Sequence, residues 1–218
     1  MGTLGAAGCL GNGDTSGSGD GDSDGDGSGG ESVRDHPAAA GLSDLPRRGD
    51  LGGHVVLTFE DPSCSRCRAF ARDTVPEIEE TLVATGQAAY VVRTYPVVYP
   101  WGEPASLALE ATFARDAEGF WALLDWYFEN QSSFSTDDVL DRTRSFLDGD
   151  TDIDGAAVVS DVEAGTAEAA VEANLDAGRN ADLGEITPIV LLFRDGEYVT
   201  TATGSVSYDV VATALGEA

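Results

Sequence analysis

The stretch Phe59-Glu-Asp-Pro-Ser-Cys-Ser-Arg-Cys-Arg-Ala-Phe70 places Cys64 and Cys67 on either side of a two-residue spacer. The residues before it, His54-Val-Val-Leu-Thr-Phe59, form a short apolar, β-branched run that predicts a buried strand. A proline then breaks this run, and Ser63 is the expected N-cap of a following helix. The cysteine pair is therefore expected where a buried strand passes into a helix.

The residues that follow the pair extend this pattern. From Cys64 to about Gly86 the apolar residues have helical spacing, and Pro76 should kink that helix. The run Ala88-Ala-Tyr-Val-Val-Arg-Thr-Tyr95 predicts a second strand. Together these segments form a β-α-β unit that carries the cysteine pair at the start of its helix.

The second half of the chain is expected to be helical first and to end in a β-β-α unit. Helical spacing recurs in residues 104–115, 119–130, 136–147 and 156–181. A strand over Pro188–Phe193, a tight turn at Asp195-Gly196, a partner strand over Tyr198–Ala202 and a helix over Tyr208–Leu215 follow. Residues 33–53, which precede the first strand, are expected to be an extended lead-in.

The cysteine pair has the chemistry of a redox-active dithiol. Free N–H groups at a helix N-terminus favour a thiolate, and a lower thiol pKa makes the corresponding disulfide more oxidising. Cys64 is expected to be the exposed attacking thiol and Cys67 the more buried resolving thiol. Arg66 and a second arginine add positive charge near the pair, whereas Glu60 and Asp61 subtract from it, so the sequence leaves the net effect open.

Two other roles for the pair are weaker. A zinc site needs four ligands, but the chain offers no second cysteine pair and only His36 and His54 as histidines. A purely structural disulfide between two cysteines three residues apart would close too short a loop to stabilise the fold much.

The charge of the chain limits its partners and suggests its solvent. The 218 residues contain 39 acidic and 12 basic residues, giving a net charge of −27, and every basic residue is Arg. A general nucleic-acid binder is excluded, since no basic stripe exists to neutralise phosphates. An acidic surface without Lys is typical of an extreme halophile, because molar salt screens the self-repulsion.

The N-terminus resembles that of a lipoprotein. Ala6-Ala7-Gly8-Cys9 is similar to a lipobox, and residues 11–30 contain only Gly, Asp, Ser, Asn and Thr. We expect residues 1–9 to be a truncated signal with Cys9 as the lipid attachment site. Residues 10–32 are then a disordered acidic linker that reaches roughly 25 Å. Only eight uncharged residues precede Cys9, so either the true start lies upstream of Met1 or Cys9 is an ordinary tail cysteine.

The linker also contains the spacing of a calcium-binding EF-hand loop. Asp20, Asp22, Asp24, Gly25 and Glu31 fit this pattern. A Gly/Asp/Ser repeat meets it easily by chance and no helical segment precedes it, so a solvated acidic linker is the favoured interpretation, with no metal site expected.

Four features together resemble the DsbA family of thioredoxin-fold oxidoreductases, and in particular its membrane-tethered members from halophilic archaea. These features are the run Thr58–Phe70, the kinked helix, a helical insertion containing Phe120-Trp121, and Ile186-Thr187-Pro188 before the late strand. The resemblance covers residues 33–218. It implies an α/β thioredoxin-like fold with an all-helical insertion, about residues 103–181, between the β-α-β and C-terminal β-β-α units.

The resemblance also implies site residues and partners. The residue matching Pro188 is a cis-proline that faces the disulfide in this family, so Thr187 and Pro188 are expected to contact substrate. An X-Pro pair that opens a central strand is a reasonable place for a cis bond. The expected partners are protein thiols and disulfides, a membrane or thiol redox partner, and the membrane through an N-terminal lipid. No cofactor besides the Cys64–Cys67 disulfide is implied.

The sequence departs from the family pattern at two places that tune redox behaviour. Many relatives keep a buried acidic residue six positions before the first cysteine to relay protons, but this position is Thr58 here, so the relay is absent or replaced by water or Glu60. The spacer is Ser65-Arg66 instead of the frequent Pro-His or Pro-Tyr, so the direction of exchange is not inherited.

The favoured function is therefore that of an extracytoplasmic thiol–disulfide oxidoreductase acting on protein substrates. Two alternatives stay open. One is a non-catalytic thioredoxin-fold binding module with inert cysteines, and the other is a reductase that serves metallocentre or cytochrome assembly.

Overall fold

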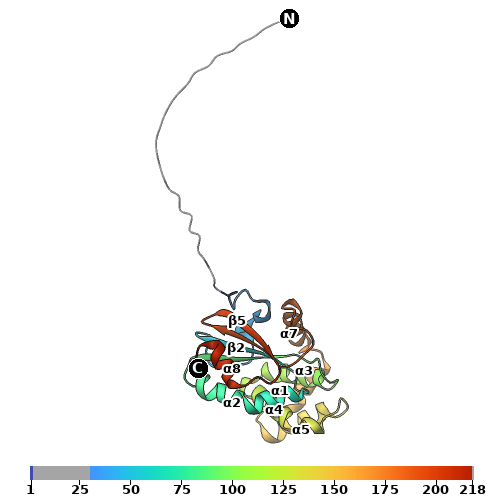
Figure 1. Ribbon diagram of the computed structural model, residues 1–218. Coiled ribbons are helices and arrows are strands. Elements are labelled where there is room, and N and C mark those ends of the chain that lie inside the picture. Colours follow the sequence, from blue (N-terminus) through green and yellow to red (C-terminus); the bar gives the residue numbers. More distant parts are fainter. Residues whose placement is uncertain (2–29, 218) are drawn as a thin grey trace.

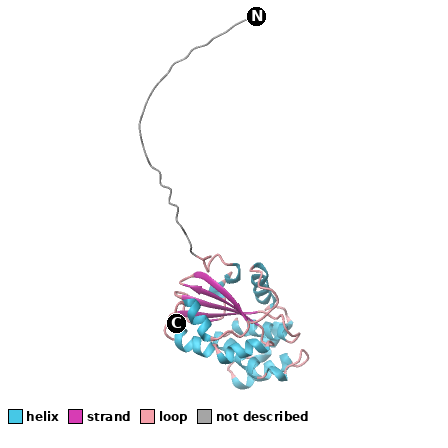
Figure 2. Cartoon of the chain, in the orientation of Figure 1, coloured by secondary structure: helices cyan, strands magenta, loops and turns pink. Residues whose placement is uncertain are grey.

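The computed structural model of the protein describes Met1 and residues 30–217, whose centre is a mixed β-sheet (Figures 1 and 2). The strand order is β1-β3-β2-β4-β5, with β2 in the middle. β2 runs parallel to β3, whereas β1 on β3, β4 on β2 and β5 on β4 are antiparallel. The strands are β1 (Arg47–Arg48), β2 (His54–Glu60), β3 (Ala88–Thr94), β4 (Ile189–Arg194) and β5 (Glu197–Thr203).

The helices are α1 (Ser65–Asp73), α2 (Val75–Ile78), α3 (Gly102–Phe113), α4 (Ala117–Glu129), α5 (Val139–Asp150), α6 (Gly155–Glu163), α7 (Glu168–Asn180) and α8 (Tyr208–Leu215). A π-turn, η3 (Glu79–Val83), continues α2, and 3-10 turns occur at η1 (Pro37–Ala39), η2 (Leu42–Asp44) and η4 (Gln131–Ser133). The expected α/β thioredoxin-like fold with a helical insertion is confirmed.

Helices cover both faces of the sheet, which explains why β2 is apolar along most of its length. One face packs on α1, α3, α4 and α8, and Val56, Tyr90 and Leu192 point into that core. The other face packs on α7 and η1, and Leu57 and Phe193 point there. Figure 1 shows α7 on one side of the sheet and the other labelled helices on the opposite side. Because side chains alternate along a strand, β2 presents Val56, then residues 58 and 60, to the face that carries α1.

Several element boundaries differ from those expected. The single helix from Cys64 to about Gly86 is interrupted at Thr74, whose φ of −123° ends α1 two residues before Pro76. Pro76 has no N–H to donate to the carbonyl of Arg72 four residues earlier, and its ring crowds that carbonyl, so α1 cannot continue and the chain restarts as α2 with Pro76 in its first turn. The expected helix over 156–181 is divided into α6 and α7 at Gly165, which has a φ of +73°.

The lead-in of residues 33–53 is more ordered than expected, since it contains two 3-10 turns and the short edge strand β1. The sequence Arg47-Arg48 carries no strand pattern of its own. Its pairing with Val91 and Tyr90 of β3 is a tertiary effect.

Residues 31–33 lie at the end of the sheet farthest from the cysteine pair. Residues 31–33 pair with the β4–β5 hairpin, and the Val33 N–H donates to the Gly196 carbonyl at 2.8 Å. That turn adjoins the start of β2, because the Asp195 N–H donates to His54 Nδ1 at 3.1 Å. The cysteines follow the other end of β2. None of the helices between residues 30 and 217 has the length and apolar character that crossing a bilayer requires.

Candidate active site

A buried carboxylate shapes the turn between β2 and α1. Asp61 Oδ1 accepts the Ser63 N–H at 2.7 Å and the Ser63 hydroxyl at 2.6 Å. The Cys64 N–H donates to the Asp61 carbonyl at 2.9 Å. Cys64 itself, with φ −80° and ψ 121°, occupies the N-cap position of α1. The expectation that Ser63 caps the helix is therefore wrong, because its hydroxyl is bonded to Asp61 instead.

The same carboxylate holds a second loop against this turn. Asp61 Oδ2 accepts the N–H groups of Val97 and Val98 at 2.8 and 2.7 Å, and Ser63 Oγ accepts the Tyr99 N–H at 3.1 Å. Burial raises the pKa of Asp61, and the hydrogen bonds from Ser63 and the loop oppose that rise. The segment after β3 is thus fixed beside the cysteines.

The helical insertion contacts the turn as well. The Gln131 amide donates to the carbonyls of Pro62 and Cys64 at 2.8 and 2.9 Å. Two segments distant in sequence, residues 97–99 and Gln131, therefore converge on the four residues before α1.

Cys64 carries the more acidic thiol. Its pKa is lowered from 9.0 to about 5, mainly by a hydrogen bond from the Cys67 thiol, with further help from the N–H groups of Arg66 and Cys67 at the start of α1; burial acts in the opposite direction. Cys64 is only 3% exposed, and its sulfur lies 3.3 Å from the Thr187 carbonyl oxygen. The expectation of an exposed Cys64 is wrong, because the segment before β4 packs against the sulfur.

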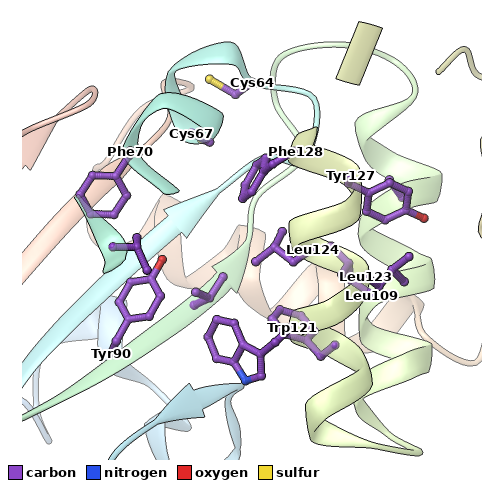
Figure 3. Close-up of a cluster of buried hydrophobic side chains, with 14 of the residues drawn as sticks. Cys64, Cys67, Phe70, Tyr90, Leu109, Trp121, Leu123, Leu124, Tyr127 and Phe128 are labelled. Atoms are coloured by element: carbon purple, nitrogen blue, oxygen red, sulfur yellow. The ribbon is translucent and has the colours of Figure 1, made fainter. Parts of the chain in front are cut away.

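Cys67 is the more buried thiol, as expected, and is fully inaccessible. Burial, the hydrogen bond to Cys64 and the charge of Glu60 raise its pKa well above the usual value. Figure 3 shows both cysteines at the start of α1, above the core that contains Phe70 and Tyr90. The two thiols of one short motif therefore have opposite protonation at neutral pH.

Thr187 adjoins the sulfurs, and Pro188 follows it. The bond between them is cis, which the resemblance had implied. The Thr187 hydroxyl is buried and, within the part of the chain that the structure describes, has no hydrogen-bond partner, yet it lowers the pKa of both thiols. It is thus a donor available to a thiolate.

The spacer residues Ser65 and Arg66 are exposed at the surface. The contribution of Arg66 to the Cys64 pKa comes from its backbone N–H. This contribution follows from the position in α1 and would be made by most residue types.

Thr58 is fully buried, and its hydroxyl lies 2.9 Å from Glu60 Oε1 and 3.2 Å from the Val91 carbonyl. Glu60 is also buried, and the Tyr90 hydroxyl donates to its Oε1 at 2.6 Å. Burial raises the pKa of Glu60 to about 7. A buried carboxyl is therefore present on this face, two residues later along β2 than the family pattern places it. The sequence had indicated Glu60, or water, as a replacement for the missing acid at position 58.

Other candidate residues lie elsewhere. Cys9, and Asp20, Asp22, Asp24 and Gly25 of the EF-hand-like spacing, are outside the described residues. His36 stacks near Phe193 and Tyr198, and His54 contacts Asp195 and Glu217 at the far end of the sheet. Residues 30–217 contain no group of His, Cys, Asp and Glu side chains arranged to hold a metal ion.

A family model described as thioredoxin matches residues 49–208, well over half of the chain. The chain belongs to the thioredoxin family. A curated relative, a probable disulfide bond formation protein D of Bacillus cereus, is 25% identical over 76 residues, which are 35% of each chain. The thioredoxin-family chain therefore aligns with only about a third of that relative's length.

Solved structures similar to this thioredoxin-family chain include the three that follow. BdbD from Bacillus subtilis in its oxidised form has a TM-score of 0.70 and 19% identity, with 80% of this chain and 95% of that chain covered. Alpha-DsbA1 of Wolbachia pipientis has a TM-score of 0.66 and 17% identity, with 79% and 92% covered. DsbA of Chlamydia trachomatis has a TM-score of 0.65 and 18% identity, with 79% and 90% covered. The fold is thus shared with DsbA-type proteins.

The acidity of Cys64 in this thioredoxin-family protein has a direct test. Alkylation requires the thiolate, so in a Cys9→Ser background we expect the rate with iodoacetamide to rise with pH and be half-maximal near pH 5. Replacing Cys67 by Ala removes the largest cause of the lowered pKa, and the midpoint should move to higher pH. A midpoint near that of an ordinary thiol in both variants would contradict the assignment.

Gly102, at the start of α3, packs on the Asp61–Ser63 pair. A Cβ there would lie 2.4 Å from Asp61 Oδ1 and 2.9 Å from Ser63 Oγ, so Gly102→Ala should destabilise the protein by about 2 kcal/mol in denaturant unfolding. Gly149 in α5 is the matched control, because an added Cβ meets nothing within 4 Å, and Gly149→Ala should be neutral or slightly stabilising. Equal effects of the two substitutions would exclude this packing constraint.

Proposed function

We propose that the protein is a thiol–disulfide oxidoreductase that exchanges disulfides with protein substrates through Cys64 and Cys67. The observation that carries this proposal is the opposite protonation of the two thiols. Cys64, with a pKa of about 5, is a thiolate at neutral pH, whereas Cys67 stays protonated. Disulfide exchange requires one ionised thiol, which acts as nucleophile or leaving group, beside a second thiol that resolves the mixed disulfide.

In the oxidising direction, a client thiolate attacks Sγ of Cys64 in the Cys64–Cys67 disulfide. The S–S bond breaks, Cys67 leaves with the electron pair, and a client–Cys64 mixed disulfide forms. A second client thiolate then attacks the client sulfur of this mixed disulfide. A disulfide forms within the client, and Cys64 leaves as a thiolate. Thr187 and Pro188 are the proposed substrate-contact residues, since the Thr187 carbonyl lies 3.3 Å from the Cys64 sulfur and Pro188 follows it in a cis bond.

The low pKa of Cys64 supports the oxidising direction over the reducing one. A stabilised thiolate lowers the free energy of the reduced form and makes the disulfide a stronger oxidant. Equilibration with glutathione in molar salt measures this directly. A reduction potential nearer to about −120 mV supports an oxidase, and one nearer to about −270 mV would identify a reductase.

We further propose an extracytoplasmic location with a lipid on Cys9. The lipobox-like Ala6-Ala7-Gly8-Cys9 supports it, as does the position at which residues 31–33 join the sheet, opposite to the cysteines. A tether attached there would direct the active site away from the membrane. Mass spectrometry of the N-terminal peptide from the native host, grown in high salt, tests this; an unmodified Cys9 would contradict the anchor.

A further inference from the structure

Glu60 occupies a position from which it can serve the buried thiol. Thr58 and Glu60 are alternate residues of β2 and so lie on the face that packs on α1, which carries Cys67. Tyr90, whose hydroxyl donates to Glu60 Oε1, belongs to the same buried core cluster as Cys67, and the charge of Glu60 raises the pKa of Cys67.

The two oxygens of this carboxyl are used differently. Oε1 lies 2.6 Å from the Tyr90 hydroxyl and 2.9 Å from the Thr58 hydroxyl, so hydrogen bonds fix the group in place. Oε2 is buried and has no hydrogen-bond partner among the described residues. A buried polar atom without a partner is costly, and here it leaves one oxygen free to take or give a proton.

The surroundings keep this proton labile near neutral pH. The titratable groups acting on Glu60 are Tyr90 from β3, Cys64 and Cys67 from α1, and Asp125 from α4, and none of them is a cation. Burial is the main reason that the pKa of Glu60 rises to about 7. A group of this pKa is suited to general acid–base chemistry at physiological pH.

We propose that Glu60 is the proton-transfer group for Cys67, and that it acts from a strand position two residues beyond Thr58. This inference rests on the proposed thiol–disulfide exchange. When the Cys64–Cys67 disulfide is attacked, Cys67 leaves as a thiolate and takes the proton of the Glu60 carboxyl, which becomes a carboxylate. In the reverse direction the carboxylate removes the Cys67 proton while Cys67 attacks Sγ of Cys64 in the mixed disulfide, the Cys64–Cys67 disulfide forms, and the client sulfur leaves as a thiolate.

A two-step reaction separates the two thiols. Reduced full-length protein, in a Cys9→Ser background and molar salt, is mixed with an aromatic disulfide that releases one coloured thiol in each step. The first release reports attack by Cys64, and the second reports attack by Cys67 on the mixed disulfide. In the unsubstituted protein the rate of the second step should rise through an inflection near pH 7.

The Glu60→Gln variant keeps the shape of the side chain and removes the base. We expect its second step to slow about 100-fold at pH 8, with the inflection near pH 7 gone, and its first step to change far less. Glu110→Gln is the matched control, because Glu110 is also buried and bonded to Thr94 and Asn174 but does not act on the cysteines. It should leave the pH profile unchanged.

Tyr90→Phe keeps the test decisive if Glu60→Gln does not fold. It removes a hydrogen bond that lowers the pKa of Glu60, so the inflection should move to higher pH. A second step whose pH profile is the same in the original protein and in either variant would overturn the inference. This outcome is distinct from failure of the proposed function, in which the intact protein would oxidise no client protein although its thiols react with the aromatic disulfide.

Discussion

We expect the Cys64→Ser variant to lose client oxidation completely and the Cys67→Ala variant to accumulate a mixed disulfide with its client. A serine hydroxyl is not ionised at neutral pH and cannot form the S–S bond, so no exchange starts. With Cys67 absent, the Cys64 thiolate can still attack a client disulfide, which joins it to one client sulfur and releases the other as a thiolate, but no resolving thiol on the protein then releases the client. Oxidative refolding of a small reduced protein in molar salt measures the first effect, and mass spectrometry of the trapped adduct measures the second.

The chain supplies its own control in the third cysteine. Cys9→Ser removes the thiol that is not part of the Cys64–Cys67 pair, so the rate of client oxidation should stay at that of the original protein. If Cys64→Ser retained full function in the host, the cysteines would be inert and a thioredoxin-fold binding module would be the better interpretation.

The fold could be predicted because its signals are local. The apolar run at residues 54–59 and the proline-broken helix after it identify the first β-α-β unit, and Asp195-Gly196 identifies the hairpin. Breaks inside helical stretches were harder to place. Gly165 has a positive φ and divides α6 from α7. The alanine-rich sequence on both sides favours helix, so the sequence pattern predicts one continuous helix there.

The site was less predictable, because its properties come from contacts distant in sequence. Cys64 was expected to be exposed, and the segment that buries it contains Thr187, more than a hundred positions later. Ser63 has the residue type of an N-cap, yet Asp61 binds its hydroxyl because Asp61 also holds residues 97 and 98. Local propensity cannot report such competition between partners.

Asp61→Ala should cause the largest loss of stability among single substitutions near the cysteines, about 3–4 kcal/mol in the free energy of unfolding. Its two oxygens accept four hydrogen bonds from Ser63, Val97 and Val98, at 2.6–2.8 Å. Removing the two oxygens leaves three backbone N–H groups without their acceptor. Each N–H that stays buried costs about 1–3 kcal/mol. Val98 is exposed, so its N–H can bond to water instead.

Asp61→Asn sharpens the test, because an amide is the same size but replaces one accepting oxygen by an NH₂ group. That NH₂ would face N–H donors whichever way the amide is turned, so Asn should recover no more than about half of the loss. Asp154 is the matched control, an exposed N-cap of α6 that accepts one bond from the Ala157 N–H at 2.9 Å, and its Ala variant should lose much less. Chemical denaturation of the reduced proteins in molar salt compares the three variants. If Asp61→Asn were as stable as the original protein, the carboxylate would not be what holds the loop after β3 against the cysteine turn.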